Sequence, residues 1–172
     1  MPELMRILKY PDPFLKRRAK RVERVTPEVR ETAARMVETM FAAHGLGLAA
    51  TQVGWDARVA VVSRNGERGG EIVVIDPEIV DTWGSDALEE GCLSFPNVNA
   101  LITRRKGVKL RYTGLDGAEH ELESEDMLAR CCLHELDHLD GITFLSKMTP
   151  ADKLANRRAL RSLEDRLAEA EA

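Results

Sequence analysis

The sequence predicts an α+β fold with antiparallel-looking strands and a buried second helix. Apolar residues recur at helical spacing after Thr26, and segments rich in β-branched residues follow one another between residues 57 and 124. Two further helical stretches complete the chain. This order of helix, strands, helix and helix indicates an α+β fold, and we expect the second helix to lie among the sheets.

The first helix is predicted from its start signal and its spacing. Thr26 and Pro27 are typical of an N-cap and a first helical residue, and the apolar spacing continues to Phe41. Gly45 and Gly47 then interrupt the helical pattern. Strands are expected at residues 57–63, 71–80, 108–114 and 119–124, with a turn in residues 65–70 between the first two.

Two helices are predicted after the strands. Ser124 is a candidate N-cap for a helix that continues to about Leu139 and stops at Gly141. A third helix is expected from Pro150. The length suits a single domain over residues 1–172, in which about 150–172 form a C-terminal helical tail.

Composition excludes several classes of protein. The chain is 44% apolar and 31% charged, as in ordinary globular proteins, and its net charge of −4 gives no bulk attraction to nucleic acid. The sequence has no membrane-spanning run of apolar residues and no signal-peptide pattern at its start. Because the 3 cysteines make a poor disulfide framework, we expect a cytoplasmic location.

The segment RCCLHELDHLDG (130–141) carries the strongest chemical signal. Each helical residue turns about 100°, so His138 lies about 40° from His134, and Glu135 about 100° from it. Met127, Leu128 and Cys131 occupy the same arc, so the three polar side chains are expected to point into the protein. Burying them without partners is costly. A metal bound by the two histidines, with the glutamate beside its water, explains the pattern. The alternative is a pair of core histidines that donate to backbone carbonyls.

A catalytic site of this kind needs a third protein ligand. Cys131 lies seven residues before His138, about 10.5 Å along the helix axis, which is too far for its short side chain. Cys131 and Cys132 are therefore expected to be buried small residues. The remaining candidates are His44, His120 and Cys92.

Three separate segments together resemble the motifs of peptide deformylases. They are GLGLAATQ (45–52), EGCLS (90–94) and HELDHLDG (134–141), which match G-x-G-L-A-A-x-Q, E-G-C-L-S and H-E-x-D-H-L-x-G. The resemblance covers the chain from about Met5 to at least Thr149. It implies the deformylase fold, with antiparallel sheets around the helix that carries HELDH. It also implies hydrolysis of the N-formyl group from formyl-methionine at the N-terminus of newly made polypeptides, with release of formate.

The resemblance also implies the metal site. Cys92, His134 and His138 would bind one divalent ion, with a water or hydroxide in the fourth position. The implied ion is ferrous iron in the cell. Zinc, nickel or cobalt are alternatives, because this set of ligands does not fix the metal.

Catalytic roles are carried over in the same way. The side-chain amide of Gln52 and the backbone N–H of Leu93 would stabilise the oxyanion, and Glu135 would move the proton. The residues expected to border the substrate are Gly45, Leu46, Gly47 and Leu128, and the two glycines would permit a positive φ or a close approach. The expected partners are formylmethionyl peptides, with the ribosome as a further candidate.

Two acidic residues have expected supporting roles. Glu90 is a candidate hydrogen-bond acceptor for a ligand histidine, and the alternative is an exposed acid before a turn. Asp137 lies about 60° from His134 on the predicted helix, on the side away from Glu135, so an ion pair with Arg104 is favoured over catalysis.

The sequence departs from many relatives at two places. An acidic residue before the glycine motif is replaced here by His44, and an arginine after E-G-C-L-S by Asn99. Both would lie at the rim of the substrate groove. One interpretation is sequence drift without functional effect at an exposed rim. The other is weaker binding of the downstream peptide, because asparagine makes only neutral hydrogen bonds where arginine makes charge-assisted ones.

Two other function classes are weighed against this assignment. H-E-x-x-H also occurs in metallopeptidases, but a cysteine ligand and the two additional motifs argue against that class. A non-catalytic relative that binds metal or docks on the ribosome would not need Gln52 and Glu135, and both are present.

Overall fold

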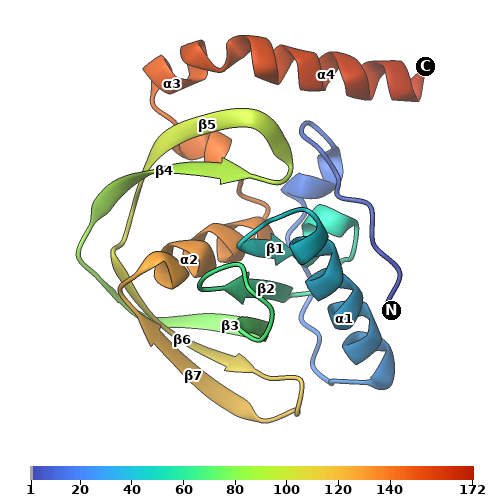
Figure 1. Ribbon diagram of the computed structural model, residues 1–172, viewed down its shortest axis with the longest axis vertical. Coiled ribbons are helices and arrows are strands. Elements are labelled where there is room, and N and C mark those ends of the chain that lie inside the picture. Colours follow the sequence, from blue (N-terminus) through green and yellow to red (C-terminus); the bar gives the residue numbers. More distant parts are fainter. Residues whose placement is uncertain (1) are drawn as a thin grey trace.

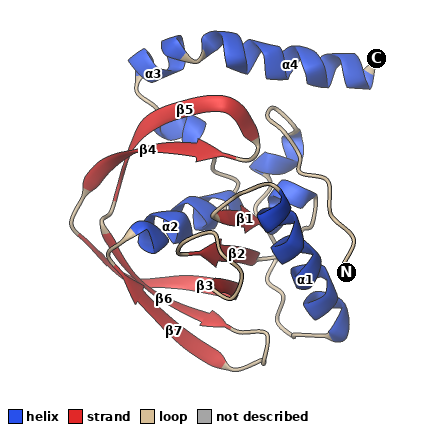
Figure 2. Ribbon diagram, viewed as in Figure 1, coloured by secondary structure: helices blue, strands red, loops and turns tan. Residues whose placement is uncertain are grey.

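Two antiparallel sheets enclose a central helix in the computed structural model, which describes residues 2–172 (Figures 1 and 2). The larger sheet has the order β1-β2-β3-β6-β7, and its strands are Gly47–Ala49, Val59–Ser63, Glu71–Trp83, Gly107–Thr113 and Glu119–Ser124. The smaller sheet pairs β4 (Asp86–Cys92) with β5 (Phe95–Arg104). All pairs are antiparallel, and the predicted α+β fold is confirmed.

Four α-helices accompany the sheets in the described residues. They are α1 (Pro27–Ala42), α2 (Met127–Leu139), α3 (Pro150–Ala155) and α4 (Arg157–Glu171). Short 3-10 turns cover Pro13–Lys16, Ala50–Val53 and Phe144–Lys147. Figure 1 shows α2 between the β4–β5 sheet and the larger sheet, so the helix that carries HELDH is central. Within residues 2–172, the structure contains no helix that is both long and apolar enough to cross a membrane.

The predicted start of α1 is confirmed, whereas that of α2 is wrong. The hydroxyl of Thr26 accepts the backbone N–H of Val29, as an N-cap does. Ser124 does not cap α2, because it still pairs with Val108 at the end of β7. Asp126 is the N-cap instead, and its side chain accepts the N–H of Leu128.

The C-terminal segment differs from the single helix that was expected. It breaks at Asn156, whose backbone (φ −98°, ψ 3°) ends α3 and begins α4. The side-chain amide of Asn156 bonds to the backbone of Asn99 in β5, so the break faces the smaller sheet. Beyond it, α4 buries Leu160 and Leu163 in a cluster with Phe95.

Three strands were not predicted, and two of them form the smaller sheet. β4 and β5 contain Gly91, Pro96 and Asn97, which are uncommon within strands. Their pairing has an irregularity between Glu90 and Cys92, which is typical of a β-bulge. Because a bulge re-aims the side chains beside it, this irregularity is positioned to turn Cys92 toward α2.

Candidate metal centre and active site

The central helix presents two histidines and a glutamate to the protein interior. His134 is 8% exposed, Glu135 is 3% exposed and His138 is fully buried. The two imidazole rings are tilted by 57° to one another and their centroids are 5.1 Å apart, as expected for neighbouring positions i and i+4 on one helix face. The sequence-based prediction that these polar side chains face inward agrees with their burial.

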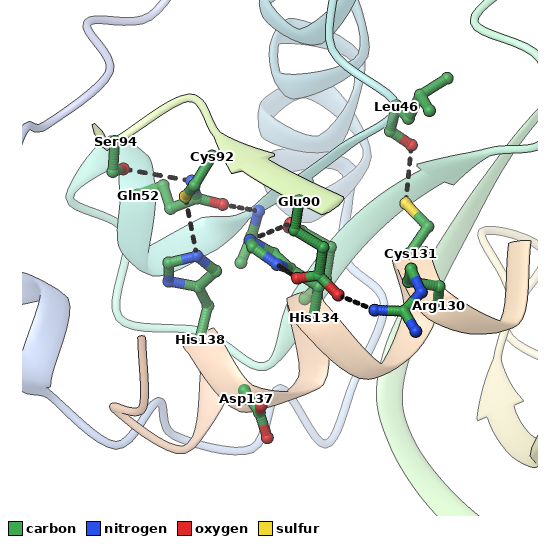
Figure 3. Close-up of polar contacts among 12 residues, drawn as sticks. Leu46, Gln52, Glu90, Cys92, Ser94, Arg130, Cys131, His134, Asp137 and His138 are labelled. Carbon is green, nitrogen blue, oxygen red and sulfur yellow. Dashed lines mark hydrogen bonds and ion pairs between the residues drawn. The ribbon is translucent and has the colours of Figure 1, made fainter. Parts of the chain in front are cut away.

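Cys92 approaches this pair from the end of β4. Its Sγ lies 3.3 Å from Nε2 of His138, and in Figure 3 the two side chains point toward one another. One ligand atom from each of Cys92, His134 and His138 lies within 4.8 Å of the others. The structure therefore brings together the three residues that the motifs suggested as ligands.

The chemistry of this group fits one metal ion. Zinc lies about 2.3 Å from thiolate sulfur and about 2.0–2.1 Å from imidazole nitrogen, so tetrahedral ligand atoms are about 3.3–3.6 Å apart. The 3.3 Å contact between Cys92 and His138 is of this size. Oε2 of Glu135 and Nδ1 of His138 are buried without a hydrogen-bond partner in residues 2–172. The glutamate oxygen therefore needs a partner from outside the protein, such as a water beside the metal.

A buried carboxylate orients the first histidine. Oε1 of Glu90 accepts Nδ1–H of His134 at 2.8 Å, which leaves the Nε2 lone pair free for a metal. Burial acts to raise the pKa of Glu90, but hydrogen bonds from His134 and Arg104 outweigh it and lower the pKa to about 2. Glu90 is therefore a carboxylate at neutral pH. Arg104 also pairs with Asp137 at 2.8 Å, as the sequence suggested.

Gln52 is fixed beside the sulfur of Cys92. The glutamine is 1% exposed, and its Oε1 accepts the backbone N–H of Ala49 at 2.8 Å. Its Nε2 therefore faces the centre, where it donates to the hydroxyl of Ser94 at 3.1 Å and lies 3.6 Å from Sγ of Cys92. Leu93 lies between Cys92 and Ser94 and lines the same cavity. The amide nitrogen of Gln52 and the backbone beside Cys92 are thus the polar groups nearest the sulfur of Cys92 on this side of the centre.

Comparisons with known proteins agree with this geometry. The family model for polypeptide deformylase matches residues 4–154. This chain belongs to the peptide deformylase family. Its members are hydrolases, and the chain is an enzyme of that kind.

Solved deformylases share the fold of this chain closely. The Legionella pneumophila enzyme is 34% identical with a TM-score of 0.90, and the match covers 96% of this chain and 98% of that one. The Plasmodium falciparum enzyme is 32% identical with a TM-score of 0.93 and coverages of 97% and 99%. The Thermotoga maritima enzyme is 38% identical with a TM-score of 0.81, and the match covers 86% of this chain and 99% of that one.

Glu135 of this deformylase is a buried carboxyl group with a raised pKa. Burial raises its pKa to about 7, although the positive charges of His134 and Arg104 act in the opposite direction. A pKa near the working pH suits a group that both accepts and returns a proton. Gly47 gives this side chain its space, since a Cβ at Gly47 would lie 2.9 Å from Cγ of Glu135. Gly45 and Gly47 do not have a positive φ, so close approach is what these glycines permit.

A cavity of about 390 Å³ opens beside the centre of this deformylase. Of the residues expected at the substrate, Gly45, Leu46 and Gly47 line it, and so do the two rim residues His44 and Asn99. Its wall also includes Met127, Arg130 and Cys131 from α2.

Leu128 does not line the cavity, so its predicted place is corrected. The residue is 1% exposed and belongs to a core cluster with Val108 and Leu110 of β6. Met127 and Leu128, which were predicted to lie on one face of α2, have different surroundings. Leu128 points about 100° away from Met127, toward the larger sheet. Met127, 44% exposed, takes the place at the cavity.

The two cysteines of α2 also differ from one another. Cys132 is fully buried as predicted, but Cys131 lines the cavity and its thiol donates to the carbonyl of Leu46 at 2.9 Å. Burial raises the pKa of Cys131 well above its ordinary value, so it remains a thiol. Neither cysteine belongs to the Cys92, His134 and His138 group. Arg130 and Ser94 also lie beside the site. Both stand in segments that the motifs singled out, but no role was predicted for either residue.

Proposed function

We propose that this deformylase hydrolyses the N-formyl group of formyl-methionine at the N-terminus of newly made polypeptides and releases formate. Cys92, His134 and His138 would hold one divalent metal ion. The observation that carries the proposal is the clustering of these three ligand atoms within 4.8 Å, directly beside a buried glutamate. A buried carboxyl group next to three metal-binding atoms is an arrangement that suits metal-assisted hydrolysis of an amide.

The metal supplies Lewis acidity and lowers the pKa of a bound water toward about 7. Glu135 performs the proton transfers. Its unpartnered Oε2 accepts the proton of the attacking water and returns it to the nitrogen that leaves the formyl carbon. In the metal-free protein, burial raises the pKa of Glu135 to about 7, in the direction that favours a carboxyl group able to hold a proton between the two steps.

Two donors stabilise the oxygen of the formyl group as it becomes negative. They are Nε2 of Gln52, fixed through the bond of its Oε1 to Ala49, and the backbone N–H of Leu93. The bond of Oε1 to Ala49 orients the amide of Gln52 in advance, so the oxyanion has only to take an N–H that now points at Ser94 or Cys92. Loss of one such donor typically lowers turnover by about 10²–10³-fold.

The cavity fits an apolar first side chain. Leu46, Leu93 and Met127 contribute apolar wall, and the volume of about 390 Å³ accommodates methionine. The ligand set of one thiolate and two imidazoles suits ferrous iron in the cell, with zinc, nickel or cobalt as alternatives. Because the proposed substrate is a newly made polypeptide, we also propose the ribosome as a partner and the cytoplasm as the location.

A formate-release assay tests the function. The protein is given a formyl-Met peptide, the same peptide with an acetyl group, and the free peptide. Formate is expected from the first and no product from the others. Cleavage of an internal bond in the free peptide would instead indicate a metallopeptidase. Metal binding without any reaction would indicate a non-catalytic relative.

A further inference from the structure

Arg130 places a buried guanidinium group beside the centre. The residue is 5% exposed, lies on α2 and takes no direct part in the proposed chemistry. Nη1 donates to Oε2 of Glu90 at 2.5 Å and to the carbonyl of Ile102 at 2.9 Å. Nη2 donates to the carbonyl of Asp86 at 3.1 Å and to its Oδ1 at 2.7 Å. One side chain of α2 thus reaches four acceptors on β4 and β5.

Glu90 is held from several sides, and Arg130 is one of its holders. Its Oε1 accepts from His134 at 2.8 Å and from Nη2 of Arg104 at 3.1 Å. Its Oε2 accepts from Nε of Arg104 at 2.6 Å and from Arg130 at 2.5 Å. Figure 3 shows Glu90 between His134 and Arg130, which lie one turn apart on the same helix. The carboxylate therefore cannot rotate away from the imidazole without breaking a bond to one of the arginines.

We propose that Arg130 is a positioning residue, which fixes the carboxylate of Glu90 and through it the ring of His134 toward the metal. The proposal rests on the metal site described under the proposed function. A ligand histidine is oriented by the hydrogen bond of its second nitrogen, and the group that accepts this bond needs fixing in turn. Arginine suits the task because its planar fork can reach several acceptors at once, whereas lysine offers a single ammonium point.

A purely structural role makes a different prediction. The bonds to Asp86 and Ile102 tie the smaller sheet to α2, and their loss would lower stability without altering the metal. The bond to Glu90 alone connects Arg130 with His134. Measurements on the metal itself can therefore separate the two roles.

Cobalt(II) is a suitable probe because its visible absorption reports the ligand geometry. Metal-free wild type, Arg130→Met and Arg130→Lys are titrated with cobalt(II) against a competing chelator, and their spectra are recorded. Arg130→Met is expected to weaken cobalt(II) binding by about 10–100-fold and to change the spectrum. Arg130→Lys is expected to stay closer to wild type than to Arg130→Met in cobalt(II) affinity and spectrum, because its ammonium can still bond to Glu90. Its melting temperature should fall, because it cannot also hold Asp86.

Arg58→Met is the matched control. Nη1 of Arg58 bonds to the carbonyl of Leu139 and to Asp140, each at 3.0 Å, so it anchors the other end of α2. It makes no hydrogen bond to Glu90 among the described residues. This variant is expected to lower the melting temperature and to leave cobalt(II) affinity and spectrum unchanged.

Wild-type affinity and spectrum in Arg130→Met, with a lowered melting temperature like that of Arg58→Met, would overturn the proposal. If Arg130→Met does not fold, Arg130→Lys decides, because it keeps a bond to Glu90 and loses the bonds to Asp86. A loss of cobalt(II) affinity in Arg130→Lys as large as the loss expected for Arg130→Met would likewise overturn the proposal. Failure of the proposed function is separate. It would show as wild-type protein that binds cobalt(II) and releases no formate, and the comparison of affinities would still stand.

Discussion

Substitution of Gly47 by alanine tests the arrangement around the proposed base. A Cβ at this position would lie 2.9 Å from Cγ and 3.0 Å from Cδ of Glu135, and 2.7 Å from Sγ of Cys131. Gly47 pairs with Val62 in the larger sheet, so its backbone cannot easily retreat. The side chains of α2 therefore have to move.

The size of the effect follows from these distances. Ordinary carbon contacts are about 3.5–4.0 Å, so Glu135 has to move by roughly 0.6–1 Å. A misplacement of about 1 Å can lower turnover by about 10²-fold, and overpacking typically costs about 1–3 kcal/mol of stability. We therefore expect Gly47→Ala to lose about 10²-fold in kcat and to retain its metal, because Glu135 is not one of the three ligands.

The assay is formate release on protein of measured metal content, together with thermal unfolding. Cys131→Ala is the single-variant control, and it is combined with Gly47→Ala in a double variant. Removing the sulfur relieves the shortest contact and leaves the contact with Glu135, so the double variant should regain stability without regaining kcat. Wild-type kcat in Gly47→Ala with full metal content would refute this reasoning.

Four further outcomes are expected. Cys92→Ala should lose metal and activity, whereas Cys131→Ala should retain its metal; metal analysis showing the reverse would contradict the ligand assignment. Glu135→Gln should keep its metal and lose at least about 10²–10⁴-fold in turnover, measured as formate release, and full activity would rule out a base at this position. Asn99→Arg should lower KM for longer formylated peptides more than it changes kcat, because an arginine at the groove rim would bind the ground state and the transition state equally. If kcat/KM of wild type already rises steeply with peptide length and the variant leaves this rise unchanged, the Asn99 difference has no effect on substrate binding. Although burial acts to raise the pKa of Glu90, hydrogen bonds from basic neighbours hold it at about 2, below the ordinary 4.5. Its ionised form therefore stabilises the metal-free fold above pH 4.5, and urea unfolding should reveal a loss of about 3 kcal/mol as the pH falls toward 2 that is absent from Glu90→Gln.

Local chemistry made some of the fold predictable from the sequence. Thr26 and Pro27 act within one helical turn, so the start of α1 could be read directly. The start of α2 could not, because Ser124 is kept in β7 by its pairing with the distant Val108. In β5 the burial alternates, but the exposed Leu101 between buried Ala100 and Ile102 is itself apolar. The sequence therefore lacks the alternation of apolar and polar residues that normally indicates a strand.

The candidate site was predictable as far as its motifs reach. The motifs named Cys92, His134 and His138, and the structure brings their ligand atoms together. Spacing alone could not distinguish Met127 from Leu128, because the division of the helix face depends on where the larger sheet lies. The ion pairs of Glu90 with Arg104 and Arg130 could not be predicted from the sequence either, because they join strands and a helix that are distant along the chain.

The most direct measurement is a metal titration of metal-free protein with formate release as the signal. A single metal site predicts no release of formate without metal, a linear rise as metal is added, and a plateau at one ion per chain. Full activity without metal, or a plateau that requires a second ion, would contradict the claim that a single site at Cys92, His134 and His138 serves the reaction.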